Sequence, residues 1–171
     1  QIWVKTKHIL SDERVMLGLW LLIGILSAVT KFSPIRHNNY LIFKGVFWHT
    51  WQQLPLYEAY PMEYGALNHY GPLFSLIIAP FAVLPDWAGM ILWNVGLAML
   101  LYWAIRKMQL TQYQHIFMLW FCAHELLTAL FMQQFNVAIA AGILLSYAFV
   151  RQGKEQWATL AIVVGTLVKL Y

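Results

Sequence analysis

Apolar residues gather in six segments along the chain, at 15–30, 72–84, 87–105, 115–131, 135–150 and 157–170. Their continuous apolar character and their length predict helices. A helix that crosses a bilayer needs about 20 residues, and only 87–105 comfortably meets that length. The other segments, of 13 to 17 residues, must recruit flanking polar residues, tilt or stop short.

Polar turns separate the later segments. In the first turn, Pro85 cannot continue a helix, and Asp86 is a good N-cap for the next one. Residues 133–136 form a second turn, and residues 151–155 form a third in which Gly153 suits a left-handed cap. The polar residues 1–14 predict an amphipathic or extended lead-in.

The stretch 34–71 is long, polar and aromatic, and it lies between the first two apolar segments. It begins with aromatic residues at helical spacing, which predict one aromatic face. These are Tyr40, Phe43, Phe47, Trp48 and Trp51. We therefore expect an amphipathic helix in the membrane interface, followed by turns at Pro55, Pro61 and Gly65. The stretch is expected to lie at the membrane surface and to carry the chemistry.

Composition supports a membrane protein. The chain is 61% hydrophobic and 11% charged, whereas ordinary globular domains carry about 25% charge. Nine Trp and nine Tyr suit the two membrane interfaces. The sequence thus predicts an all-α, polytopic integral membrane protein. It has about six transmembrane or half-spanning helices in a single transmembrane domain over 1–171.

The net charge of +4 comes from scattered cations rather than a basic stripe. This excludes a nucleic-acid partner and favours membrane lipids. The single Cys122 cannot form an intramolecular disulfide. The chain has no initiator Met and stops directly after the last apolar segment, so we interpret it as the N-terminal part of a longer protein.

The distribution of Lys and Arg predicts an orientation. If all six segments span, one side holds four cations and the other holds seven. The four are Lys5, Lys7, Arg14 and Lys169, and the seven are Lys31, Arg36, Lys44, Arg106, Lys107, Arg151 and Lys154. The positive-inside rule would then place 34–71 in the cytoplasm. A single short segment that does not span would reverse this.

Three ionisable residues stand inside or beside apolar segments. His124 and Glu125 lie in the middle of 115–131, where a charge in lipid costs at least a few kcal/mol. We expect this pair to face a cavity or a partner; alternatively Glu125 is neutral, or paired with His124 or with the cations at 106–107. Lys169 either contacts a lipid phosphate or snorkels to the interface.

Two carboxylates in 34–71, Glu58 and Glu63, are candidate general bases at a membrane-surface cavity, although each could equally be a solvated loop residue. The three histidines of this stretch are 12 and 20 residues apart, which matches no known metal-ligand spacing. The sequence therefore predicts no cofactor; a divalent metal is compatible with it but not indicated.

Several short patterns together resemble glycosyltransferase family 87. They are Asn38-Asn39-Tyr40-Leu41-Ile42-Phe43, Leu56-Tyr57, His69-Tyr70-Gly71-Pro72, Pro80, Leu84-Pro85, Gln134-Phe135-Asn136 and Lys169. The family's own pattern has an Asp-Phe-x-x-Tyr block, a Pro-Tyr, a Tyr-x-Pro that opens the second span, a Gly-Gln-x-Asn turn and a later lysine. The order and spacing hold from Asn38 to Lys169.

The resemblance implies a polyprenyl-phosphate-mannose-dependent α-mannosyltransferase of the C-type superfamily, in the cell inner membrane. A carboxylate in the first extracytoplasmic loop would deprotonate a lipid or glycan acceptor. The acceptor would displace the polyprenyl phosphate with inversion, while positive groups offset the charge on the leaving phosphate. The family topology puts 34–71 outside the cytoplasm, against the charge count, and we follow the family.

The resemblance also implies a set of site residues. The family's aspartate aligns with Asn39, whose amide cannot act as a base, so Glu63 or Glu58 would take over. The implied substrate-binding residues are Asn38, Tyr57, His69, Tyr70, Glu125, Gln134, Asn136 and Lys169. Asn39 also favours an alternative, in which the chain is a non-catalytic membrane subunit or an inactive homologue. A third alternative, a transporter, is supported only by His124 and Glu125 within an apolar segment.

Overall fold

The computed structural model describes residues 11–32 and 37–169, which form seven α-helices and no strand. The helices are α2 (Glu13–Lys31), α3 (Asn38–Trp51), α4 (Leu73–Ala82), α5 (Asp86–Lys107), α6 (Gln112–Phe131), α7 (Asn136–Arg151) and α8 (Glu155–Val168). Each apolar segment is one helix, and α3 opens the aromatic stretch. The all-α prediction is confirmed. Most of the predicted lead-in lies outside the described residues.

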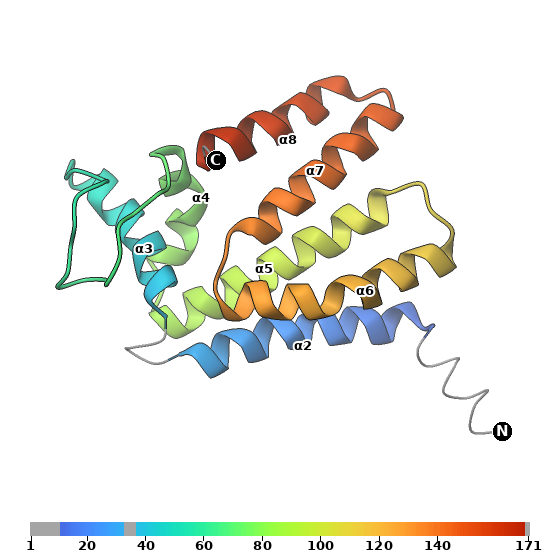
Figure 1. Cartoon of the computed structure of the whole chain (residues 1–171), viewed down its shortest axis with the longest axis horizontal. Coiled ribbons are helices and arrows are strands. Elements are labelled where there is room, and N and C mark those ends of the chain that lie inside the picture. The colour runs from blue at the N-terminus through green and yellow to red at the C-terminus, as the bar shows by residue number, and fades with distance from the viewer. Residues whose placement is uncertain (1–10, 33–36, 170–171) are drawn as a thin grey trace.

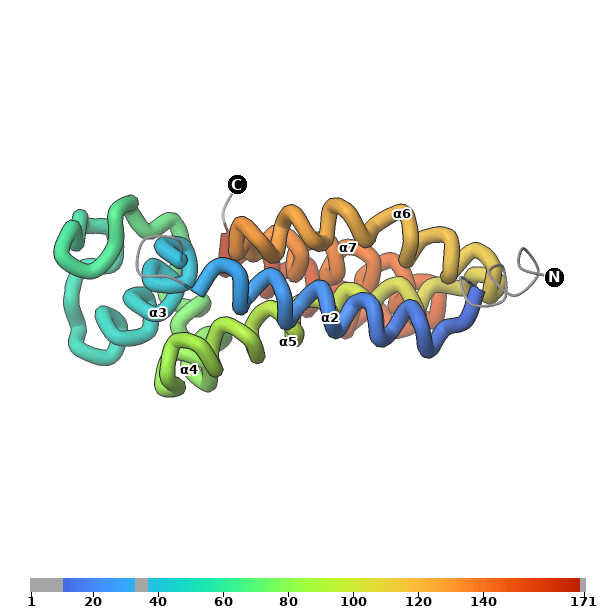
Figure 2. Tube along the Cα trace, turned by 90° about the horizontal axis from the view of Figure 1, so that it is seen from below, coloured from blue at the N-terminus to red at the C-terminus, as the bar shows by residue number. Residues whose placement is uncertain are grey.

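The bundle that runs along the length of the molecule consists of α2, α5, α6, α7 and α8 (Figure 1). Helices α2, α6 and α8 run in one direction, and α5 and α7 run in the other. Helix α2 packs on α5 and α6, and α7 packs on α5 and α8. Helices α3 and α4 pack against each other at one end, which we call the loop end (Figure 2). Helices α2, α6 and α8 therefore finish at the loop end, where α5 and α7 begin.

Local signals set where the helices begin and end. The Asp12 carboxylate accepts a hydrogen bond from the Arg14 N–H at 2.8 Å at the start of α2. Helix α5 is capped by Pro85, so Asp86 is its first residue rather than the predicted N-cap. Gly153 has a φ of 69°, as the third predicted turn requires, and Gln133 in the second turn has a φ of 52°.

Aromatic rings fill the core at the loop end. Phe43 of α3 contacts Phe74 of α4 and Trp93 of α5, with ring centroids 5.1 and 5.8 Å apart. Phe135, just before α7, lies 5.3 Å from Phe74 and 6.0 Å from Trp93. The Phe135 and Trp93 rings are stacked and the other three contacts are edge-to-face, and both arrangements add stability beyond the area that they bury. The cluster fixes α3, α4, α5 and the start of α7 to one another.

The single aromatic face predicted for α3 is wrong. Tyr40 and Phe43 are buried in the core, whereas Trp51 is 74% exposed. The reason is that the first two turns of α3 pack into the bundle, and only its end is free to turn rings outward. The Tyr40 hydroxyl donates to the Phe81 carbonyl at 3.0 Å. Burial, and then the nearby Asp86, raise the pKa of Tyr40, which keeps its hydroxyl protonated as a donor.

An ion pair ties the outer side of α3 to the start of α5. The Lys44 ammonium lies 2.6 Å from one Asp86 carboxylate oxygen, and His37 Nε2 lies 3.9 Å from the other. The Lys44 and His37 side chains are mostly shielded from solvent, with exposures of 27% and 7%. The contacts of Asp86 with these two side chains therefore hold α3 against the start of α5.

Among the described residues, two helices are long and apolar enough to cross a membrane. They are α2, with 19 residues, and α5, with 22. Helices α4, α7 and α8 are apolar but shorter, at 10 to 16 residues. The expectation that 87–105 is long enough is therefore confirmed by α5, and α2 is longer than its apolar segment suggested.

The positions of the cations change the orientation argument. Helix α4 has 10 residues and stays at the loop end (Figure 1). Of the described cations, five lie at the opposite end of the bundle, and three lie at the loop end. The five are Arg14, Arg106, Lys107, Arg151 and Lys154, and the three are Lys31, Lys44 and Lys169. The count made for six spans was wrong because α4 does not run the length of the bundle.

The junction between α3, α4 and α5 has no room at Gly89. The Cβ atom of an alanine there would collide with the Tyr40 hydroxyl and lie 2.6 Å from the Phe81 carbonyl oxygen. We expect Gly89→Ala to lower the free energy of unfolding by about 1–3 kcal/mol. Thermal unfolding of the purified protein measures this.

Gly96 of the same helix is the matched control, because nothing lies within 4 Å of the corresponding Cβ position. Gly96→Ala should raise stability by about 0.5–1 kcal/mol, since alanine loses less chain entropy in a helix. Equal effects of the two substitutions would contradict the packing described for Gly89.

Candidate functional site

An apolar groove of about 950 Å³ runs between α5 on one side and α7 and α8 on the other, and α4 contributes to it at the loop end. Trp93, Leu97 and Leu100 of α5 face Ile139 of α7 and Leu160 of α8 across it. Of the residues that line it, only Thr166 and Lys169 carry a hydroxyl or a charge. A ligand that fits this groove is predominantly hydrocarbon.

Lys169 stands at the loop end of the groove within a polar network. Its ammonium donates to Asn136 Oδ1 at 2.8 Å and lies 5.9 Å from the centre of the Tyr70 ring. The Asn136 side-chain amide donates to Gln134 Oε1 at 3.2 Å. We call these four residues the Lys169 cluster. The structure brings together four of the eight side chains predicted to bind substrate.

Three separate elements position the Lys169 cluster. Gln134 and Asn136 belong to the turn that opens α7, and Lys169 follows α8 directly. The Gly71 N–H donates to the Val168 carbonyl at 3.4 Å, which joins the loop to the end of α8. Tyr70 stacks on Phe74 with ring centroids 4.6 Å apart. The cluster therefore depends on the aromatic core beneath it.

Asn68 shapes this part of the loop, and the sequence analysis missed it. Its side chain is buried, and its amide donates to the carbonyls of Leu56 and Tyr70 at 3.2 and 3.0 Å. Its Oδ1 accepts from the Tyr70 N–H at 2.9 Å. The signal in the sequence was an asparagine two residues before the aromatic residue that it orients. The neighbouring His69, predicted to bind substrate, is exposed.

The two asparagines at the start of α3 form hydrogen bonds to other segments of the chain. The Asn39 amide donates to the Met132 carbonyl at 2.8 Å, which joins α3 to the turn after α6. Asn38 Oδ1 accepts from the Gly65 N–H at 2.6 Å. Position 39 therefore supplies a hydrogen-bond donor in this chain, and an ionised aspartate there would lose that bond.

The predicted bases lie in the loop between α3 and α4. Glu63 Oε2 lies 3.0 Å from His49 Nε2, and the His49 ring is buried while Glu63 is half exposed. The Tyr64 hydroxyl lies 3.4 Å from His49 Nδ1, and the Tyr60 ring stacks on His49 at 3.9 Å. If Tyr64 donates to Nδ1, the proton on Nε2 points at the Glu63 carboxylate.

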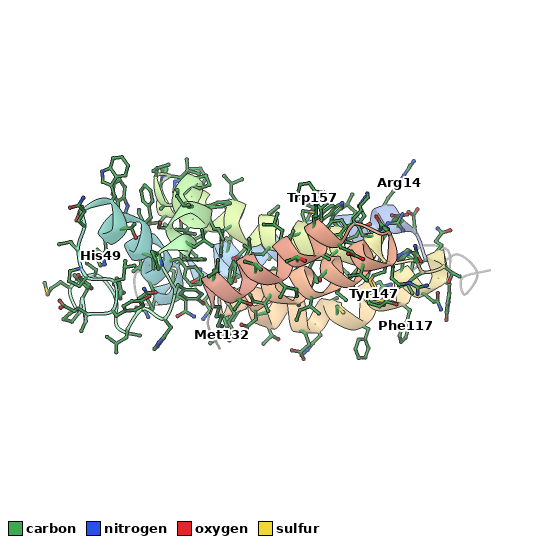
Figure 3. The ribbon with its side chains drawn as sticks, turned by 90° about the horizontal axis from the view of Figure 1, so that it is seen from above. Arg14, His49, Phe117, Met132, Tyr147 and Trp157 are labelled. Atoms are coloured by element: carbon green, nitrogen blue, oxygen red, sulfur yellow. The ribbon has the colours of Figure 1, made fainter. Side chains whose placement is uncertain are left out.

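His49 is one of the three histidines that were weighed only as metal ligands. Its pairing with Glu63 was not predicted. Nothing in the spacing signalled the pair, because a loop of irregular structure joins the two residues. Figure 3 shows His49 at the tip of the loop end. Burial, and then the Glu63 carboxylate, raise the pKa of Tyr64, so its hydroxyl stays protonated beside the histidine. Tyr57 and Glu58 are both exposed on the same loop.

His124 and Glu125 were expected to face a cavity or a partner; the cavity is wrong, and the partner stays a prediction. Both side chains are 84% exposed on the outside of α6, and His124 Nδ1 lies 3.6 Å from Glu125 Oε1. The reason is that α6 turns its buried residues, such as Leu119 and Leu126, towards the bundle. The alternative, in which Glu125 is paired with His124, is what the structure contains.

The sequence matches one known protein family. The sequence model of glycosyltransferase family 87 matches residues 68–171, more than half of the chain. The chain belongs to glycosyltransferase family 87. No curated protein and no solved structure gives a match.

The family 87 match divides the candidate site. It covers α4 to α8, so all four residues of the Lys169 cluster lie within the matched region. The candidate bases Glu58 and Glu63 precede it, and so does Asn39. The part of the site on the helices therefore follows the family, and the first part of the loop lies outside the matched residues.

The role of Asn39 as a donor is testable with one substitution. We expect Asn39→Asp to lower the free energy of unfolding by about 1 kcal/mol, because the donor is lost and a carboxylate faces the Met132 carbonyl. Asn38→Asp is the matched control, since a carboxylate still accepts from the Gly65 N–H. Thermal unfolding measures both. Equal stability of the two variants would contradict the assigned roles.

Proposed function

We propose that this chain is a membrane glycosyltransferase that uses a polyprenyl-phosphate sugar, mannose by family resemblance, and transfers the sugar to a lipid or glycan acceptor. The observation that carries the proposal is the apolar groove with Lys169 at its loop end. An isoprenoid chain has no hydrogen-bonding groups and suits the apolar walls. Its phosphate suits an ammonium and a side-chain amide at the edge.

The position of the cations supports a membrane placement with the loop end outside. Helices α2 and α5 cross the bilayer, and α7 and α8 line the groove within it. Five described cations at the opposite end favour the cytoplasm for that end under the positive-inside rule. We assign the chain to the inner membrane as a multi-pass protein, with residues 37–72 extracytoplasmic.

In the proposed reaction, a residue at the end of α8 binds the leaving phosphate and a residue of the loop accepts the proton. The acceptor hydroxyl attacks the anomeric carbon, the bond from that carbon to the phosphate oxygen breaks, and polyprenyl phosphate leaves with the electron pair. Lys169 stabilises the charge that develops on the leaving phosphate. The acceptor proton passes to a carboxylate of the loop. Inversion follows from a single displacement.

Glu63 is the preferred base among the acidic residues at the loop end. Asp86 is already paired with Lys44 at 2.6 Å. Glu63 is half exposed and oriented by a buried histidine. Glu58 is exposed and serves as the second choice. The alternative function, a non-catalytic subunit, is favoured by one observation, which is that Asn39 has become a structural donor.

Replacing Lys169 tests the donor site. We expect Lys169→Ala to lower kcat/KM for a polyprenyl-phosphate mannose donor roughly ten- to hundredfold, since a charged hydrogen bond is worth about 1.5–3 kcal/mol. Lys154→Ala, at the opposite end of the bundle, is the control and should retain the rate. Transfer by the full-length protein in membranes measures both. Equal rates in the two variants would count against this donor site.

Replacing the loop carboxylates tests the base. We expect Glu63→Gln to lower kcat roughly 10²- to 10⁴-fold, the usual contribution of a general base. Glutamine can still accept a hydrogen bond from His49, so the loop should remain folded. Glu58→Gln is the matched control. Full turnover by both variants would exclude a loop glutamate, and no transfer by the folded wild-type protein would favour the subunit alternative.

A further inference from the structure

Of the three described helices with 18 or more residues, α2, α5 and α6, helix α6 has the fewest buried residues. It has 20 residues, but it does not qualify as a span by composition, unlike α2 and α5. Five of its residues are buried, compared with nine in α5. Its outward side carries large aromatic rings as well as charge. The exposed rings include Tyr113, Phe117 and Phe121, which are 60–76% exposed.

His124 and Glu125 lie on this same outward side of α6. Both are 84% exposed, and neighbouring residues on a helix do not face each other, so their 3.6 Å contact leaves most of each group open. Helix α6 packs along α2 and therefore shares its depth (Figure 2). With α2 in the bilayer, as the proposed function has it, the pair would meet hydrocarbon.

Exposure of this pair to lipid is unfavourable. An acidic residue in the middle of a membrane helix is costly when it faces lipid. Such residues face other protein groups in membrane proteins. Phe117 and Phe121 stack on each other at 6.0 Å next to the pair and add apolar surface for packing. These features together indicate a protein–protein interface.

The charges of this face indicate what covers it. It presents a carboxylate and an imidazole side by side, so its own copy supplies the complementary groups. Two copies inserted in the same orientation hold these residues at the same depth. A twofold axis along the membrane normal then lets His124 meet Glu125 of the partner subunit, and Glu125 meet His124 of the partner subunit. A different partner, or a later segment of the same polypeptide, would have to place a polar group of its own at that depth.

We propose that the outward face of α6, from Tyr113 to Thr128, is the interface of a homodimer in the membrane. The proposal rests on the membrane placement given under the proposed function, but not on sugar transfer. The reciprocal histidine–glutamate contacts fix the register of the two helices. The aromatic rings towards the start of α6 supply the packing.

Disulfide cross-linking in native membranes tests the interface. The full-length protein with Cys122→Ser provides a background without the cysteine of this chain. Phe121→Cys on α6 is compared with Leu22→Cys on α2, which is 49% exposed. We expect a covalent dimer from Phe121→Cys and little from Leu22→Cys. Equal yields, or a cross-link to a different polypeptide, would overturn the dimer.

Charge exchange then tests the pairing itself. His124→Glu places two carboxylates from each copy opposite each other, so the yield of the Phe121→Cys dimer should fall several-fold. Adding Glu125→His restores one acid and one imidazole in exchanged positions and should recover the yield. If the double variant is folded, as shown by an unchanged unfolding temperature, and stays uncross-linked, the reciprocal contacts are refuted.

Alkaline extraction separates the two levels of failure. If the wild-type protein is released from membranes by carbonate, the membrane placement fails, and the proposed function and the dimer fail with it. If the protein stays in the membrane and Phe121→Cys gives no dimer, only the interface is wrong. Retention together with specific cross-linking supports both.

Discussion

The turn between α6 and α7 is hydrogen-bonded to two other parts of the chain, the start of α3 and the residue that follows α8. The Met132 carbonyl accepts from Asn39, and the Gln133 side chain accepts from the Tyr40 N–H at 3.3 Å. Asn136, at the start of α7, accepts from Lys169. A buried polar group is costly unless it is hydrogen-bonded, so these bonds fix the turn. Helix α3 and the end of α8 are both placed by this turn.

The aromatic core lies directly beneath that turn. Phe135 is the residue of the turn that points into the core, where it meets Phe74 and Trp93. The polar side chains on either side of it then have one direction left, towards the loop end. Packing and hydrogen bonding thus act on the same few residues. This explains how a short turn can hold an ammonium group at the edge of an apolar groove.

Family membership and the geometry of the loop bear on different questions. The family 87 match covers the helices that enclose the groove and the residues at its edge. The loop before it has its own arrangement, in which a buried His49 holds Glu63 and Asn39 is a donor to Met132. The helices that enclose the groove lie within the matched residues, and most of the loop lies outside them.

The six apolar segments and the three tight turns were readable in the sequence, because hydrophobic period, proline and glycine act over a few residues. The sequence did not show which side chains of α3 point into the core. The spacing that predicted one aromatic face could not show that Tyr40 and Phe43 enter the core while Trp51 stays outside. Likewise, family patterns predicted each residue of the Lys169 cluster on its own. They did not indicate that the four residues would lie together.

The sequence by itself determined the all-α class, the positions of the helices and the residue types available for chemistry. Only the tertiary structure decided which side chains share a site, that α4 stays at the loop end, and that His124 and Glu125 face outward. The physical reason is that helix formation depends on neighbours along the chain. Side-chain direction depends on which helices pack together, and that is settled by contacts between residues far apart in the sequence.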